Sequence, residues 1–200
     1  VPSEAATTKG IGNYTVTYAN GTLTIDKRDV TVTITGHTDT KTYSGSEQSV
    51  TGYDVSISDR AYQASYIAFS GTAEAKGTDA SDAKYMMGLE ESRFSTIEAQ
   101  AGNFNVTFAV TDGWLKIDKA TLTVTAKPQT YTYNGGTQGP AGTYTDSLDT
   151  YVTVSGLVEG DALTGITLTG SKTDAGTYEG EIVPSEAATT KGIGNYTVTY

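Results

Sequence analysis

Apolar and polar residues alternate along much of the chain with the two-residue period of a β-strand. Val30, Val32 and Ile34 are separated by threonines, and residues 122–126 repeat the arrangement. Since side chains two apart lie on one face of a strand, both stretches predict strands with one apolar and one threonine-rich face. Further strands are predicted at residues 55–57, 66–69, 85–89, 151–154, 166–168 and 178–183.

Two dipeptides, Asn20-Gly21 and Asp112-Gly113, interrupt this alternation and predict β-hairpins. Both suit the type I′ turn, which needs positive φ at its two central residues. Each tip places apolar residues of the two flanking strands opposite one another. The pairs are Tyr18 with Leu23, Val16 with Ile25, Val110 with Leu115 and Phe108 with Ile117.

One stretch has a different period. Phe94, Ile97 and Ala101 follow helical spacing before a glycine, and Ser185 is the candidate N-cap of a corresponding helical turn. The predicted fold class is all-β, with tandem antiparallel β-sandwich-like (Ig-like) modules arranged end to end. The alternative is a series of β-grasp-like modules with one short helix each.

Two repeats define the predicted organisation. Residues 1–18 recur unchanged at 183–200, which indicates a recently duplicated unit of 182 residues. Inside it, NYTVTYANGTLTIDK from Asn13 resembles NFNVTFAVTDGWLKIDK from Asn103, and KTYSG at 41–45 resembles YTYNG at 131–135. We therefore expect module A at 28–119 and module B, lacking its last strand, at 120–200. Residues 1–27 are expected to be the C-terminal hairpin of a preceding B-type module.

Composition excludes several classes of function. The 200-residue chain has no cysteine, one histidine and a formal net charge of −10. The acidic balance argues against a nucleic acid partner, because phosphate binding needs clustered Lys and Arg. No apolar run approaches the ~18 residues of a membrane-spanning helix, so we expect no membrane insertion.

Candidate catalytic and metal-binding residues are few. His37 follows a predicted strand and is expected to be a solvated loop residue, which leaves no Ser-His-Asp or Cys-His site. Asp79 with Asp82, and Asp26 with Asp29, could supply oxygen ligands to calcium, but they lack EF-hand spacing. We expect no enzyme activity and no cofactor.

Three motifs carry a resemblance to a known family. The first is G-L-x-x-G-D in SGLVEGDALTGITLTG (155–170), and the second is DAGTYEGEI (174–182), with Ala175 where the family usually has Val. The third is the closing N-Y-x-x-x-Y-x-x-G-x-L-x-I of NYTVTYANGTLTI (13–25). These motifs resemble the MBG-type repeats of bacterial cell-surface and adhesin proteins. Module A has loose versions of the second and third motifs and lacks the first motif, G-L-x-x-G-D.

The resemblance implies a tandem array on a large secreted or cell-wall-anchored bacterial protein, and it implies no catalytic residues. We expect an extracellular stalk that extends a functional domain from the cell, with neighbouring repeats of the same protein as partners. The alternative is weak, multivalent binding of a host glycan, mucin or matrix protein. Residues 1–27 also predict head-to-tail self-association.

Three side chains are candidate contact or crosslinking residues. Trp114 replaces Thr22 of the B-type hairpin on the predicted threonine face, where it could bind a ligand, contact another module or cover apolar surface. Lys127 and Asn195 are the candidate pair for an isopeptide crosslink of the kind that surface adhesins contain.

Overall fold

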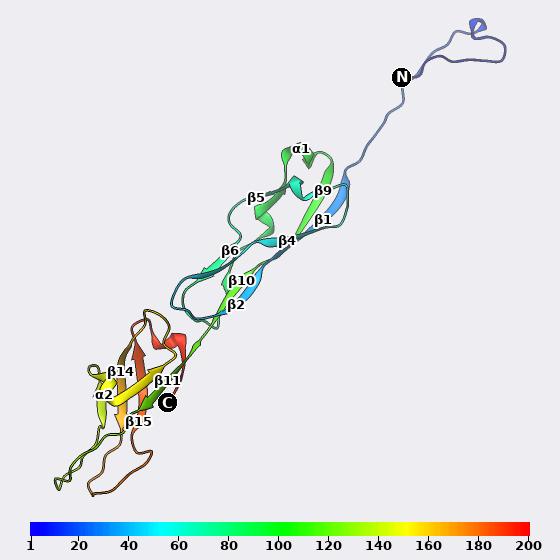
Figure 1. Ribbon diagram of the computed structural model, residues 1–200. Coiled ribbons are helices and arrows are strands. Elements are labelled where there is room, and N and C mark those ends of the chain that lie inside the picture. The colour runs from blue at the N-terminus through cyan, green and yellow to red at the C-terminus, as the bar shows by residue number, and fades with distance from the viewer.

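The chain forms an elongated all-β structure in which two groups of strands follow one another along one axis (Figure 1). This computed structural model describes all 200 residues and contains sixteen strands in six small sheets. The α-helices are single turns, α1 (Glu98–Ala101) and α2 (Leu148–Tyr151), and none could span a membrane. The predicted all-β, sandwich-like class is confirmed.

The first group of strands lies within residues 28–119. Its sheets have the orders β4-β1-β9, β2-β10-β7, β3-β6 and β5-β8. The strands are β1 (Arg28–Gly36), β2 (Thr38–Thr42), β3 (Gln48–Thr51), β4 (Tyr53–Ile57), β5 (Ile67–Phe69), β6 (Glu74–Gly77), β7 (Tyr85–Met86), β8 (Phe94–Thr96), β9 (Phe104–Thr111) and β10 (Trp114–Asp118).

The second group lies within residues 120–200, and its sheets have the orders β13-β11-β16 and β12-β14-β15. Only Lys119 separates β10 from β11, and every strand pair joins two strands on the same side of Lys119. The strands are β11 (Ala120–Ala126), β12 (Gly142–Tyr144), β13 (Val152–Ser155), β14 (Leu163–Thr169), β15 (Val183–Thr189) and β16 (Tyr196–Thr199).

A parallel ribbon runs the length of module A. Strand β1 pairs with β9 from Arg28 opposite Phe104, and β2 continues the same register with β10 to Thr42 opposite Asp118. In module B, β11 and β16 are likewise parallel. The expectation of wholly antiparallel modules is therefore wrong for these pairs. The chain enters each module at one end and leaves it at the other end. The first and last strands of a module therefore point in the same direction, and they pair in parallel.

The predicted hairpin at Asp112-Gly113 is absent, because β10 continues along the axis instead of folding back on β9. Neither residue has positive φ, as a type I′ turn requires. Asp112 instead accepts hydrogen bonds from the backbone N–H groups of Gly88 and Leu89, at 3.0 and 2.8 Å. The Asp-Gly pair marks the point at which the ribbon passes from one sheet to the next.

Glycine is needed at this crossing because two backbones meet there. A Cβ at Gly36 would lie 2.2 Å from the Gly113 nitrogen, and a Cβ at Gly113 would lie 2.5 Å from both the His37 carbonyl oxygen and the Met87 sulfur. Close backbone approach, not turn geometry, explains the glycine in the Asp-Gly pair.

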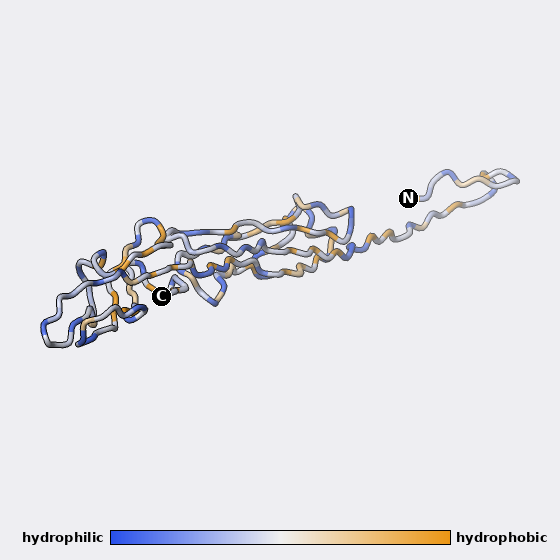
Figure 2. Tube along the Cα trace, turned by 60° about the horizontal axis from the view of Figure 1, so that its bottom comes forward, coloured by the Kyte–Doolittle hydropathy of each residue, from blue (hydrophilic) through white to orange (hydrophobic).

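The N-terminal tail, residues 1–27, contains no strand, so the predicted hairpin at Asn20-Gly21 is also absent. Apolar and polar positions alternate along the extended part of the tail (Figure 2), where Leu23 and Ile25 are 85% and 86% exposed. Residues 1–18 nevertheless keep the local conformation of 183–200. The Ala5 N–H donates to the Tyr18 hydroxyl at 3.0 Å, as Ala187 does to Tyr200 at 2.8 Å.

The two helical predictions have different outcomes. Helix α1 lies within the stretch with helical spacing. Ser185 does not cap a helix: it lies in β15 and pairs with Thr167 of β14. Residues 178–182, predicted as a strand, precede β15 without pairing. The antiparallel pairing of β15 with β14 is a tertiary contact, and it outweighs the local capping signal.

The hydrophobic core is one continuous cluster that passes through both modules. It is centred on the inward residues of the strands that the alternation predicted, and Tyr43 and Tyr196 continue it across the junction. The side chains that are fully buried are Val32, Ile34, Leu115, Ile117, Leu122, Val124, Ile166 and Leu168.

Candidate functional site: the seam between the modules and an open groove

The seam is the contact between modules A and B beside Lys119. Tyr43 follows β2 of module A and Tyr196 begins β16 of module B. Their rings meet edge to face with centroids 5.5 Å apart, and each residue is 3% exposed. Burial, followed by the charges of Asp161 and Asp79, raises the pKa of Tyr43. Two aromatic rings thus exclude water from the centre of the seam.

Asn195 makes the polar contact of the seam. Its Oδ1 accepts a hydrogen bond from the Ala80 N–H at 2.8 Å, and its Nδ2 donates to the Asp79 carboxylate at 3.1 Å. Nδ2 also donates to the Lys191 carbonyl at 2.9 Å, which holds the amide within its own module. Asn195 is 5% exposed, and its buried amide has hydrogen-bond partners in both modules.

Lys191 provides a second polar link. Its Nζ donates to the carbonyl of Gly45 in module A at 2.9 Å and to that of Glu159 in module B at 3.2 Å. The seam therefore joins two loops of module A to residues of module B by direct hydrogen bonds.

Asp161 holds the module B side of the seam in place. It accepts hydrogen bonds from the hydroxyls of Thr190 (2.5 Å) and Tyr196 (2.7 Å) and from the backbone N–H groups of Lys191 (3.0 Å) and Ala162 (2.9 Å). Burial disfavours the ionised carboxylate, but these four donors outweigh it and lower the pKa of Asp161 to about 2. Burial, helped by the nearby Asp161 carboxylate, raises the pKa of Tyr196 to about 12.

Two of the three sequence motifs meet at this seam. Asp161 ends the G-L-x-x-G-D element, while Asn195 and Tyr196 begin the closing element. Their partners in module A, Tyr43 and Asp79, were not predicted from the sequence as seam residues. A usable signal was present, because the Asp79-Ala80 dipeptide recurs in the matching segment of module B.

The candidate crosslinking residues have different partners. The Lys127 amino group donates to the Asp149 carbonyl, while the Asn195 amide is occupied at the seam. The structure does not bring the two side chains together.

Trp114 lies away from the seam. It pairs with Thr38 and Met86, and the Lys84 amino group lies 3.5 Å from its ring centroid. The residue is half-buried, and these neighbours all belong to module A.

His37 joins β1 to β2. Its ring nitrogens lie 2.8 Å from the Thr51 carbonyl oxygen and 3.3 Å from the Asp54 carboxylate. These two hydrogen bonds raise the pKa of His37 above its ordinary 6.5. No group of three or more His, Asp or Glu side chains is arranged to hold a metal ion, and among the calcium candidates Asp79 interacts with Asn195.

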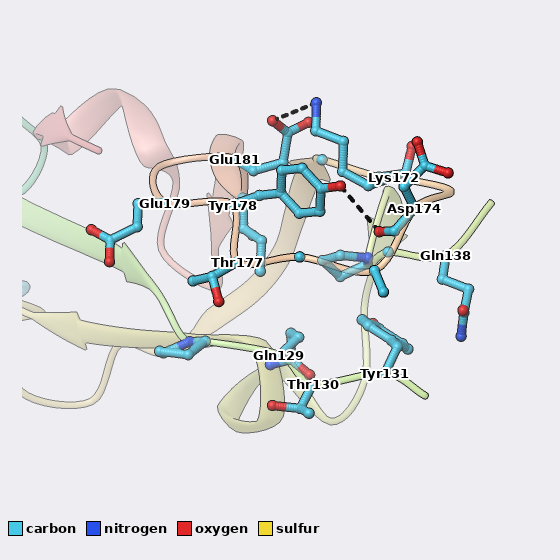
Figure 3. A pocket seen from close by; sticks show the side chains of 18 of the residues that line it. Gln129, Thr130, Tyr131, Gln138, Lys172, Asp174, Thr177, Tyr178, Glu179 and Glu181 are labelled. Atoms are coloured by element: carbon cyan, nitrogen blue, oxygen red, sulfur yellow. Dashed lines mark hydrogen bonds and ion pairs between the residues drawn. The ribbon is translucent and has the colours of Figure 1, made fainter. Parts of the chain in front are cut away.

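An open groove of about 780 Å³ lies in module B between residues 126–140 and 170–182 (Figure 3). Three tyrosines that line it, Tyr131, Tyr133 and Tyr178, are 48%, 63% and 42% exposed. The Tyr178 hydroxyl donates to the Asp174 carbonyl at 3.0 Å, and Lys172 pairs with Glu181 at 3.0 Å. Both contacts join residues within 170–182 and therefore fix the shape of that side of the groove.

Comparisons with known proteins agree with the motifs. Residues 122–200 match the family model of the MBG domain, YGX type, which confirms the MBG-type resemblance over these residues. The searches of curated proteins and of solved structures gave no match for the chain.

Proposed function

We propose that this chain, whose residues 122–200 match the MBG domain, is a structural tandem-repeat segment of a large bacterial surface protein. It acts as an extracellular stalk that holds a functional domain away from the cell, and neighbouring repeats are its partners. The observation that carries this proposal is the seam. A single residue, Lys119, separates β10 from β11, and buried contacts cross between the modules beside it.

The ribbon supports extension because it runs along the axis. Fifteen residues of each strand, 28–42 and 104–118, traverse module A, which is about 50 Å at ~3.3 Å per residue. The B-type residues 14–26 cover roughly 43 Å on the same basis. One 182-residue unit therefore extends the stalk by about 90 Å. Strands folded back as hairpins would have given a shorter unit.

Small-angle X-ray scattering of chains with one, two and three 182-residue units tests this function. We expect the maximum dimension to grow linearly by about 90 Å per unit. A matched control carries a flexible Gly/Ser segment inserted after Lys119, which should give a more compact average shape. Growth with the square root of copy number in the unmodified chains would contradict a stalk. Mucin or glycan binding that saturates and strengthens with copy number would favour an adhesive function.

A further inference from the structure

The strands by which the chain enters and leaves module A belong to one parallel ribbon. The chain enters at Arg28, the first residue of β1, and leaves at Asp118, the last residue of β10. These residues lie at opposite ends of the ribbon, which is about 50 Å long at ~3.3 Å per residue (Figure 1). Tension in the chain therefore pulls the two sides of the ribbon in opposite directions along their length.

Hydrogen bonds join the two sides of the ribbon from end to end. Eight residue pairs connect β1 with β9, and five connect β2 with β10. At the entry end, the Arg28 N–H donates to the Asn103 carbonyl at 3.0 Å. At the exit end, the Tyr43 N–H donates to the Asp118 carbonyl at 2.8 Å. The ladder therefore covers the whole path between the two points at which tension reaches the module.

The crossing from one sheet to the next does not interrupt this ladder. Between the last pair of β1 with β9 and the first pair of β2 with β10, the Trp114 N–H donates to the His37 carbonyl at 3.1 Å. On the other side of the same chain segment, the Met87 N–H donates to the Gly113 carbonyl at 3.0 Å. The two sheets therefore act as one continuous ribbon when it is pulled along its axis.

Each strand that receives the tension first is the central strand of its sheet. Strand β1 lies between β4 and β9, and β10 lies between β2 and β7. Outside the ribbon, the Thr31 carbonyl accepts from the Ser58 N–H, and the Ile117 carbonyl accepts from the Ser81 N–H, both at 3.0 Å. Four side chains on these two strands are 0% exposed: Val32, Ile34, Leu115 and Ile117. Moving either strand therefore breaks bonds on both of its edges and exposes core side chains.

The direction of the tension decides how many hydrogen bonds resist it. When the two sides of a ladder are pulled from opposite ends, all the bonds are strained together, and several must break before the strands slip. When both sides are pulled from the same end, the bonds break one after another, and each carries the whole force. Because forced unfolding is governed by the unfolding rate, the first arrangement withstands more force at the same free energy of unfolding.

We propose that module A bears mechanical load, and that its parallel ribbon is the clamp that resists tension along the chain. The clamp consists of β1 and β2 on one side and β9 and β10 on the other. The pair of β5 with β8 lies outside the clamp and carries no load until the clamp breaks. This function goes beyond extension, which requires only length, and it rests on the proposed stalk as the source of the tension.

Single-molecule force spectroscopy on the full chain tests the clamp by changing only the direction of pulling. The sequence has no cysteine, so two introduced cysteines are unique attachment points. In K27C/K119C the attachment points lie at opposite ends of the ribbon, and the ladder is loaded in shear. In K27C/N103C both lie at the entry end, and the strands separate bond by bond. All three substituted residues are exposed, so both variants should show the same thermal unfolding.

We expect the unfolding force in shear to be several-fold higher than the force that separates the strands from one end. Complete unfolding should release about 280 Å in the first geometry and about 270 Å in the second, at ~3.6 Å per residue after subtraction of the folded separation. These similar lengths identify the same unfolding event in both experiments. Equal unfolding forces in the two geometries would overturn the proposal.

Two matched substitutions locate the resistance within module A. Ile34→Val removes one methylene group from a buried side chain of β1, and Ile67→Val makes the same change in β5. At constant force in shear, Ile34→Val should speed unfolding by about 2–10-fold, because its contacts are lost when the clamp breaks. Ile67→Val should leave this rate unchanged, since β5 and β8 are still paired at that point. A rate increase for Ile67→Val as large as that for Ile34→Val would also overturn the proposal.

The force experiment and the scattering experiment fail separately. Chains that lengthen linearly in scattering but unfold at equal force in both pulling geometries would keep the stalk and exclude the clamp. Chains that are compact in scattering but resist shear would keep the clamp and exclude the stalk.

Discussion

The Nδ2 of Asn195 donates a hydrogen bond to the Asp79 carboxylate across 116 positions of sequence, and this bond joins module B to module A. The identical residue in the first copy of the repeated segment, Asn13, donates to the Lys9 carbonyl at 2.9 Å and is exposed. The same 18-residue sequence therefore lies at the seam in residues 183–200 and in the exposed tail in residues 1–18. A substitution in the tail copy is a matched control for the same substitution at the seam.

Asn195→Ala should destabilise the protein by about 1–3 kcal/mol, because the Ala80 N–H and the Asp79 carboxylate lose a buried partner. Asn13→Ala, in the same sequence, should change the free energy of unfolding by less than about 0.5 kcal/mol. Urea unfolding monitored by tyrosine fluorescence measures both. Equal effects of the two substitutions would contradict the assigned seam.

Acid should weaken the seam through Asp161. The pKa of its carboxyl lies at about 2 in the folded protein and near 3.8 when unfolded, so the folded state binds the proton less readily. The resulting stability is present above pH 3.8 and is lost as the pH falls toward about 2. Thermal melting between pH 5 and 2 checks this. Asp161→Asn should lower stability at pH 5 and remove that part of the pH dependence, whereas an unchanged acid profile would refute it.

His37 should titrate above its ordinary pKa of 6.5, because the Thr51 carbonyl and the Asp54 carboxylate both favour the imidazolium. Its stabilising contribution is complete below pH 6.5 and declines as the pH rises through the higher folded pKa. NMR titration of the single histidine measures this value directly. Asp54→Asn should lower it while the Thr51 bond remains, and a midpoint below 6.5 in the unmodified chain would contradict the assignment.

Gly113→Ala tests the crossing of the ribbon. The new Cβ would lie 2.5 Å from the His37 carbonyl oxygen, so we expect destabilisation of about 1–3 kcal/mol. Gly21→Ala is the control, because nothing lies within 4 Å of a Cβ there. Chemical denaturation compares the two. A Gly113→Ala chain as stable as the control would mean that the backbones do not approach closely at this point.

The strands were predictable because their signal is local. Alternation at Val30, Val32 and Ile34 fixes which face is buried, whatever the partner strand. The pairing was not predictable from Asp112-Gly113, since a dipeptide that favours a turn also suits a close approach of two backbones. The partner of β9 is β1, 76 positions away. No property of the residues around Asp112 identifies a partner at that distance.

The seam was predictable only in part. The motif residues Asp161, Asn195 and Tyr196 were visible as elements of a repeat, but their spacing does not say that they form a contact surface. That surface depends on how module A presents Asp79 and Ala80, and the recurrence of this dipeptide in module B does not show which surface it contacts. Polar contacts between loops are set by tertiary packing, so they follow from the fold and not from local pattern.

Because the first and last strands of a module point the same way, adding a unit never reverses the chain. In the proposed stalk, recombination between the identical 18-residue stretches would insert or remove whole units, and the far end would then move outward or inward but keep its orientation. The orientation of the far end is the same for an odd and for an even number of units. Such a lineage could adjust its reach in steps of about 90 Å without redesigning a single contact.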